Sequence, residues 1–301
     1  MKVLVTGASG FIGRQCCVQL GDKGYEVHAV SSRSQPDNTI NWHKVDLLDS
    51  QQTIKLIRKI QPTHLLHLAW YAEPGKFWTS KKNYHWIKAS LTLFEEFAES
   101  GGRRAVVAGT CAEYDWGFDE YIEYITPLDP QTLYGVCKHS LQLMLASYAS
   151  LQRLSFAWGR IFSLYGPHEH PDRLFASVIL SLLKNQEVKC NNGELIRDYL
   201  HVDDVASAFV SLLNSDIEGP VNIGSGTGTK LKDIVGKIEK KINKFGYLKI
   251  NNKPINNKNV PIIIADNKRI SSIGWKPIHN IDSGLEHTID WFKRNQFSQN
   301  V

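Results

Sequence analysis

The sequence lacks most features of disulfide-bonded, membrane-spanning or nucleic-acid-binding proteins. The five cysteines are Cys16, Cys17, Cys111, Cys137 and Cys190. Their odd number and the lack of any Cys-x-x-Cys pair argue against a disulfide framework or a zinc site, so we expect a reducing compartment and no metal ion. No apolar run is long enough to span a membrane. Met1 leads directly into an apolar segment rather than a signal peptide, so we expect a cytoplasmic protein without a membrane partner.

The excess of positively over negatively charged residues is also small. The 301 residues carry 35 Lys and Arg against 30 Asp and Glu, and no dense basic cluster is interleaved with aromatic residues. A patch for a small anion explains this balance as well as a nucleic-acid partner does, and dispersed surface lysines explain it better than either, so we expect no nucleic-acid partner. There is no low-complexity tract or obvious repeat, and the length suffices for one large domain or two smaller ones.

Three glycines lie at regular spacing near the start of the chain. An apolar strand over 3–5 runs into a turn with glycines at three-residue spacing, and an amphipathic helical stretch over 15–20 follows. Such a turn places backbone N–H groups and the positive end of a helix dipole at one point, which suits a pyrophosphate. A glycine-rich turn without a ligand is the alternative. The predicted contacts to a dinucleotide are Gly7, Gly10, Phe11, Ile12 and Gly13.

The second expected strand, over 25–31, indicates which dinucleotide is bound. In this type of fold an Asp or Glu about 20 residues past the glycines binds the adenosine 2′-hydroxyl of NAD. This chain has Ser31, Ser32 and Arg33 there, with Arg14 just after the glycine turn. Hydroxyl and guanidinium groups suit a 2′-phosphate, so NADP(H) is favoured over NAD(H). The alternative is that both arginines are only surface residues.

Strands and helices alternate over the first half of the chain, which predicts an α/β fold with a doubly wound parallel Rossmann sheet. We expect residues 1–165 to form this dinucleotide-binding domain, with a strand and helix near 199–224 returning to it. Residues 166–301 are expected to form mainly a smaller C-terminal α/β substrate-binding domain. The expected strands cover 45–47 at the end of the third, 63–68, 104–109, 154–160 and 221–223, with short strands within 188–199. The expected helices cover 50–60, 81–100, 131–151, 172–185, 203–214, 231–242 and 283–294, and a polar loop covers 251–259.

Several residues lie where the ligands of a parallel sheet bind, at the carboxyl ends of expected strands. Asp46, followed by Leu47, is placed to reach the adenine, and Ala69 is placed against the cofactor. His67 ends the fourth strand, and a packed, hydrogen-bonded histidine is its favoured interpretation. The aromatic stretch 70–78 contains a Pro-Gly turn and is expected to form a loop over the site.

Tyr134 and Lys138 are the residues that suggest a reaction. Four residues apart on a helix, they share one face. An ammonium group beside a phenol favours the phenolate and is expected to lower the tyrosine pKa. Such a tyrosine exchanges the proton of a sugar or alcohol hydroxyl while a hydride moves at the carbon. Thr110, at the end of the fifth strand, is expected to hydrogen-bond the reacting oxygen.

These motifs resemble the extended short-chain dehydrogenase/reductases, also called the NAD-dependent epimerase/dehydratase family of nucleotide-sugar enzymes. The resemblance covers nearly the whole chain. It rests on the segments 6–13, 46–47, 67–69, 134–138, 160–167, 197–206 and 222–226. By resemblance, Thr110, Tyr134 and Lys138 match the family's Ser/Thr-Tyr-Lys triad, and Arg197 matches the arginine that grips the nucleotide diphosphate. The family usually dimerises through two helices per subunit, which implies a homodimer through 81–100 and 131–151.

Departures from the family pattern bear on the reaction. Sugar 4,6-dehydratases of the family carry acidic residues one or two positions after the triad Ser/Thr. This chain has Cys111 and Ala112 there and Glu113 one step further, which disfavours dehydration. Ser163 replaces a frequent Asn. The segments 70–80, 111–124 and 166–197 are expected to form the sugar pocket, with Cys111, Ala112 and Arg173 as substrate contacts, although 114–124 is alternatively a surface loop.

The sequence thus predicts an NADPH-dependent reductase of a nucleotide-activated keto-deoxysugar, most simply at a C4 ketone, with Tyr134 as the acid. NADP preference carries this choice, because reductases consume a reduced cofactor. A nucleotide-sugar epimerase that acts by transient oxidation is the alternative, since the triad permits it equally. A regulator that binds the dinucleotide without turnover is a third hypothesis, and the intact triad argues against it.

Overall fold

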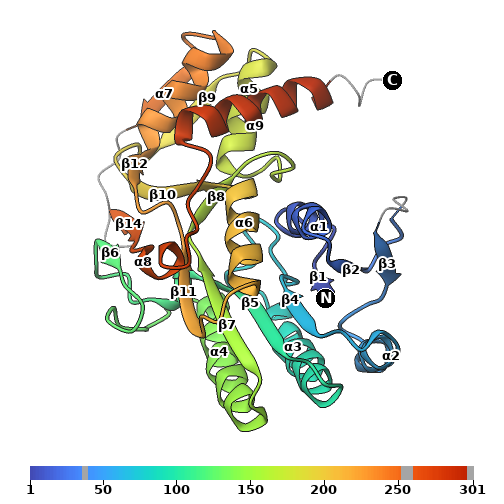
Figure 1. Cartoon of the computed structure of the whole chain (residues 1–301). Helices are drawn as coiled ribbons and strands as arrows, with labels where there is room; N and C mark the ends of the chain where they lie inside the picture. The colour runs from blue at the N-terminus through green and yellow to red at the C-terminus, as the bar shows by residue number, and fades with distance from the viewer. Residues whose placement is uncertain (36–39, 252–259, 297–301) are drawn as a thin grey trace.

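A computed structural model describes residues 1–35, 40–251 and 260–296. Its centre is a sheet of seven parallel strands (Figure 1). In spatial order these are β3 (Asn41–Lys44), β2 (Glu26–Ser31), β1 (Lys2–Thr6), β4 (His64–His67), β5 (Arg104–Thr110), β7 (Ser155–Ile161) and β11 (Gly219–Ile223). The order reverses between β1 and β4, and the carboxyl ends of strands at such a point border the crevice in which α/β proteins bind ligands.

Helices cover both faces of this sheet. One face holds α1 (Gly13–Asp22) and α6 (Val202–Leu213), and the other holds α2 (Ser50–Ile60), α3 (Lys82–Glu99) and α4 (Leu133–Gln152). The central strands therefore have no face toward water, which explains why β5 reads as an apolar run in the sequence. The expected doubly wound α/β fold is confirmed, and most expected helix and strand bounds lie within two or three residues of those observed.

Most of the remaining elements form a second set of layers beside the central sheet. Its helices are α5 (Leu174–Leu183), α7 (Leu231–Ile242) and α9 (Ile281–Gln296), which share an apolar core with β9 (Val188–Asn191). β9 pairs with β13 (Leu248–Asn251). A further sheet contains, in order, β12 (Gly228–Lys230), β10 (Ile196–His201), β14 (Ile262–Ala265) and β6 (Glu120–Tyr121), with β8 (Ser163–Tyr165) beside β10.

The C-terminal elements were only partly visible in the sequence. β6, β12, β13, β14 and the short α8 (Lys268–Ser271) were not expected, because segments of two to four residues carry almost no periodicity. The expected polar loop over 251–259 lies outside the described residues except at its first position. Segment 114–124 is not a plain surface loop, since Tyr114 and Tyr121 are fully buried and β6 pairs with β14.

In the part of the chain that the structure describes, no helix combines the length and the apolar character that crossing a bilayer requires.

Candidate active site

The glycine turn between β1 and α1 is tightly folded. Gly7 has a positive φ of 67°, and a Cβ there would lie 2.8 Å from the backbone nitrogen of Ala69. A Cβ on Gly13 would overlap the carbonyl oxygen of Gly7, whereas a Cβ on Gly10 would meet only that carbonyl, at 3.0 Å. Two glycines are therefore required by the packing of the turn against β4 and α1, and Gly10 keeps the outer side of the turn open for a ligand.

The N-terminus of α1 has the electrostatics of an anion site. Its N-cap, Ile12, provides no side-chain hydrogen bond, and the first turn holds no acidic residue. The N–H groups at this end are thus not neutralised by a carboxylate, and the helix dipole adds partial positive charge there. These residues fit the pyrophosphate of a dinucleotide.

Arg14 is held against the same turn. Its guanidinium donates to the carbonyl oxygens of Ser9 (2.8 Å) and Gly10 (3.2 Å), and it lies 3.1 Å from Nδ1 of His168. The arginine therefore stiffens the turn and ties it to the loop after β8. Partial burial lowers the pKa of the guanidinium.

The end of β2 carries hydroxyl groups close to the turn. The Ser31 hydroxyl accepts hydrogen bonds from the Ser9 hydroxyl (3.2 Å) and from the backbone N–H of Arg33 (3.1 Å). Ser32 and Arg33 are exposed beside it. Ser32 and Arg33, which are predicted to bind a 2′-phosphate, thus lie together on one exposed turn. The buried Ser31 hydroxyl links this turn to the glycine turn by hydrogen bonds.

β4 and β3 end near the same edge of the sheet. His67 is buried, with Nδ1 2.6 Å from the Thr6 hydroxyl and Nε2 2.8 Å from the Ser90 hydroxyl, so its expected structural role is confirmed. Burial lowers the pKa of His67 to about 3, so the ring is neutral. Asp46 lies in the turn after β3, where its carboxylate accepts from the backbone N–H of Leu48 and remains exposed.

Thr110 ends β5 and begins a short 3-10 helix, Cys111–Glu113. Its hydroxyl accepts from the backbone N–H of Ala112 at 3.2 Å, and its own backbone N–H donates to the Glu113 carboxylate at 2.8 Å. This reciprocal capping box fixes the threonine rotamer at the carboxyl edge of the sheet.

Glu113 is the residue that most strongly shapes this edge. Its fully buried carboxylate accepts from Trp158 Nε1 (2.9 and 3.0 Å) and from Arg160 Nε (2.8 Å), besides the Thr110 N–H. Both of its carboxylate oxygens are therefore engaged by structural partners. In the sequence, Glu113 is recognised only as an acidic residue one position beyond those that the dehydratases carry. No local pattern predicts its pairing with residues more than 40 positions away.

Tyr134 lies in the first turn of α4, under the loop that follows β4. Its backbone N–H donates to the carbonyl of Trp78 at 3.1 Å, and its ring makes edge contacts with Phe77 and Trp78 at centroid distances of 4.9 and 5.8 Å. Trp78 in turn contacts Trp116. The expected loop over the site is observed, and its aromatic rings form the wall around the tyrosine.

Lys138 lies one turn further along α4 and is buried. Its Nζ donates to the carbonyl oxygen of Ala108 on β5 at 2.8 Å and lies 3.8 Å from the centroid of the Trp70 ring. Burial lowers the pKa of this ammonium group to about 7. Lys138 therefore lies on the same face of α4 as Tyr134, and its ammonium group is hydrogen-bonded to β5 at the edge of the sheet.

The structure does not support the expected lowering of the Tyr134 pKa by Lys138. Burial raises the pKa of Tyr134 well above its ordinary value, and a hydrogen bond with Thr110 only partly opposes the increase. The lysine is engaged by the Ala108 carbonyl and by Trp70, and the acidic side chain of Glu113 further disfavours a phenolate. The prediction of a lowered tyrosine pKa is thus wrong for this arrangement of residues, in which the phenol keeps its proton.

The predicted substrate residues divide into two groups. Cys111, Ala112 and Arg173 lie around the triad: Cys111 and Ala112 follow Thr110 directly, and the positive charge of Arg173 acts on Tyr134. Burial raises the pKa of the Cys111 thiol to about 12, so it stays protonated. Arg197 instead donates to backbone carbonyls, those of Ile196 at 2.7 Å and Val260 at 2.8 Å, so its guanidinium lies against its own sheet edge.

Comparison with known proteins fits this geometry. The model of the NAD dependent epimerase/dehydratase family matches residues 3–224. The chain belongs to this family. It is 26% identical to a UDP-glucose 4-epimerase of Rhizobium leguminosarum bv. trifolii, over 98% of both chains. It is also 26% identical to a dTDP-4-dehydro-6-deoxyglucose reductase of Escherichia coli, over 95% of this chain and 96% of the other.

A solved structure gives the same relationship in three dimensions. MoeE5 in complex with UDP-glucuronic acid and NAD superimposes with a TM-score of 0.84 at 27% identity, covering 98% of this chain and all of the other. The resemblance to the epimerase/dehydratase family that the sequence motifs indicated is therefore confirmed, and relatives of two reaction types match over nearly their whole length.

Proposed function

We propose that this member of the epimerase/dehydratase family is an NADPH-dependent reductase of a nucleotide-activated keto-deoxysugar, acting at the C4 ketone. The observation that carries the choice is the end of β2, where Ser31 ends the strand, Ser32 and Arg33 follow it, and residues 32–35 include no carboxylate. A carboxylate there would repel a 2′-phosphate, whereas serine hydroxyls and a guanidinium bind one.

The triad suits the proton step of a reduction. The bound dinucleotide supplies a hydride to the carbonyl carbon, and the carbonyl oxygen becomes an alkoxide that needs one proton. Tyr134 stays protonated because burial raises its pKa, so it is ready to give that proton. The Thr110 hydroxyl, which lies close enough to Tyr134 to oppose the rise in its pKa, holds the same oxygen. Lys138, whose pKa of about 7 lies near neutrality, replaces the proton on the phenolate from solvent or holds the cofactor ribose.

The site also explains why dehydration is disfavoured. The acid/base work of a dehydratase needs a free carboxyl group near the threonine, and Glu113 is engaged by Thr110, Trp158 and Arg160. Cys111, with a pKa of about 12, is too weak an acid at neutral pH to replace it.

Cofactor preference is tested by titrating NADPH and NADH separately and following the quenching of tryptophan fluorescence. We expect tighter NADPH binding. In Arg33→Ala the affinity for NADPH should fall about 10-fold or more, since a charge-assisted hydrogen bond contributes roughly 1.5–3 kcal/mol, while NADH binding stays unchanged. Arg103→Ala is the matched control, because this exposed arginine directly precedes β5, at the amino end of the strand. Preference for NADH would overturn the assignment.

The reaction is tested by screening keto-sugar nucleotides for NADPH oxidation and determining product configuration by NMR. One NADPH consumed per product indicates reduction. An isomerised sugar with no net change in cofactor would indicate the epimerase, which the relative from Rhizobium favours. Tyr134→Phe should abolish turnover and leave dinucleotide binding intact; full activity in this variant would show that another residue is the acid.

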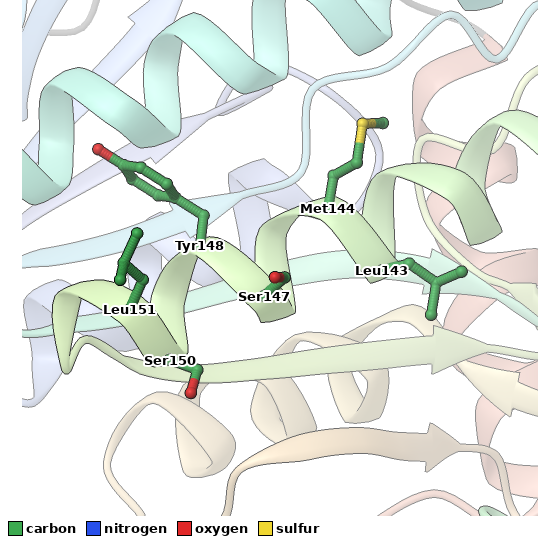
Figure 2. A pocket seen from close by; sticks show the side chains of 6 residues that line it. All are labelled: Leu143, Met144, Ser147, Tyr148, Ser150 and Leu151. Carbon is green, nitrogen blue, oxygen red and sulfur yellow. The ribbon is translucent and has the colours of Figure 1, made fainter.

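We further propose that two copies of the chain associate through α3 and α4. The outer face of α4 carries exposed apolar side chains, Leu143, Met144 and Leu151, and forms a shallow hollow with Ser147, Tyr148 and Ser150 (Figure 2). Pairing this face with its copy would remove these side chains from water. Sedimentation should give twice the chain mass, and Leu143→Asp should give the monomer; a monomeric wild-type protein would contradict the proposal.

A further inference from the structure

A group of three histidines and one aspartate lies outside the triad and has no role in the reaction above. His201 ends β10, Asp203 is in the first turn of α6, His279 belongs to the segment before α9, and His287 is on α9. One nitrogen or oxygen atom from each of the four lies within 4.8 Å of all the others. In Figure 1 the red segment that leads to α9 runs beside α6, which brings residues almost 80 positions apart together.

The spacing of these atoms is that of a nearly closed coordination shell. Asp203 Oδ2 lies 3.6 Å from His201 Nδ1, 3.8 Å from His279 Nε2 and 3.6 Å from His287 Nδ1. A four-coordinate zinc ion with bonds of about 2.0–2.2 Å places neighbouring ligand atoms roughly 3.3–3.5 Å apart. The three distances to Asp203 therefore need to shorten by only a few tenths of an ångström, whereas the set as a whole, whose atoms lie within 4.8 Å of one another, would have to draw together further before a tetrahedron is complete.

Hydrogen bonding occupies one of the donor atoms and leaves two others without a partner. Nδ1 of His201 accepts from the backbone N–H of Asp203 at 3.3 Å, so the ring proton is on Nε2, and an ion bound through Nδ1 would displace this long hydrogen bond. His287 Nδ1 and Asp203 Oδ1 are buried and, within the described chain, have no hydrogen-bond partner. Unpaired buried polar atoms of this kind call for a missing partner.

The three imidazole rings are packed closely together. The ring of His201 lies 4.2 Å from that of His279 and 5.2 Å from that of His287, centroid to centroid. Three imidazoles with a carboxylate form a donor set that suits zinc and its neighbours in the transition series.

The surrounding chain holds the ligands in place. The Asp204 carboxylate accepts from the backbone N–H groups of Ile278 (2.8 Å) and His279 (3.0 Å), and Trp275 Nε1 donates to the Ser207 hydroxyl (2.9 Å). These bonds fix the segment before α9 to α6. Ligand-bearing segments that are already docked lose little entropy when an ion binds, which favours affinity.

We propose that His201, Asp203, His279 and His287 bind a divalent transition-metal ion of the zinc type, which clamps α9 and the preceding segment to the N-terminus of α6. All four positions of a tetrahedron are filled by protein atoms, so the site is structural and leaves no open position for substrate. Gln19 on α1 donates to the Asp203 carbonyl at 3.0 Å, which connects the clamp to the helix of the glycine turn. The sequence prediction of no metal ion considered cysteine patterns alone.

Metal binding is tested directly on the full chain, freed of any purification tag and stripped with a chelator. Calorimetric titration with Zn²⁺ should show one equivalent bound. Co²⁺ should give the intense visible d–d bands of a tetrahedral N/O site without a thiolate charge-transfer band. Zn²⁺ should also raise the unfolding temperature, because an ion that binds only the folded state stabilises it.

Variants identify the ligands. His279→Ala and His287→Ala, both at partly exposed positions, should fold and should weaken Zn²⁺ binding beyond the roughly 10–100-fold that loss of an outer hydrogen-bond partner costs a metal site. His85→Ala, at an exposed histidine on α3, should bind as wild type does. Zn²⁺ binding that is absent, or that survives both ligand variants, would overturn the proposal. So would an unfolding temperature that responds to pH but not to metal, which would indicate a proton-linked histidine–aspartate cluster.

Discussion

Burial of the Lys138 ammonium group lowers the free energy of unfolding, and comparison with Lys138→Met measures by how much. The ammonium group is buried on α4 against β5, and its pKa is lowered from 10.5 to about 7. Lys138→Met removes the charge while keeping most of the apolar volume. The comparison is made without dinucleotide, so that only the chain's own residues contribute.

The magnitude follows from the pKa difference between the two states. With a pKa of 10.5 in the unfolded chain and about 7 in the folded one, burial of Lys138 costs roughly 4 kcal/mol at pH 7 and roughly 2 kcal/mol at pH 9. The sign follows from proton binding. Between pH 7 and pH 10.5 the unfolded state binds more protons than the folded state, so the penalty is full below pH 7 and disappears as pH rises through this window.

The assay is urea unfolding of the wild type and of Lys138→Met at pH 7, 8 and 9. The free energy of unfolding of the wild type, relative to that of the variant, should rise by about 2 kcal/mol between pH 7 and pH 9. Lys88→Met, at an exposed position on α3, controls for general loss of a positive charge and should show no such trend. A constant difference between wild type and Lys138→Met would show that Lys138 keeps its ordinary pKa, and the argument from burial would fail.

Three further predictions follow from buried contacts. Gly13→Ala should abolish dinucleotide binding in a calorimetric titration, because the new methyl group would overlap the Gly7 carbonyl; unchanged binding would show that the turn is not the cofactor site. Glu113→Gln should lower the free energy of unfolding in urea by about 3–5 kcal/mol, because it leaves the buried Arg160 charge without a counter-ion; a loss under 1 kcal/mol would refute the pairing. Asp198→Asn should destabilise the chain by about 1–3 kcal/mol in the same assay, because its carboxylate accepts four hydrogen bonds, three of them from backbone N–H groups; wild-type stability would show that these bonds are dispensable.

Local patterns predicted the first half of the fold well. The helix 50–60 has the predicted bounds because Asp49 caps it and Pro62 stops it, and both signals lie within the segment itself. The structural role of His67 was also predictable, since a histidine at the end of a buried strand needs partners close by. Short strands such as β6 and β14 escaped prediction because each is defined by its partner rather than by its own period.

The sequence by itself determined the features that depend on spacing over a few residues: the glycine turn, the tyrosine and lysine one helical turn apart, and the family to which the chain belongs. Only the tertiary structure decided how Glu113 is used, where Arg197 points, and that Tyr134 keeps its proton. It alone assembled the histidine–aspartate cluster from β10, α6 and α9. Helical and strand periods are encoded locally, whereas burial, charge pairing and ligand sets arise where the topology brings distant segments together.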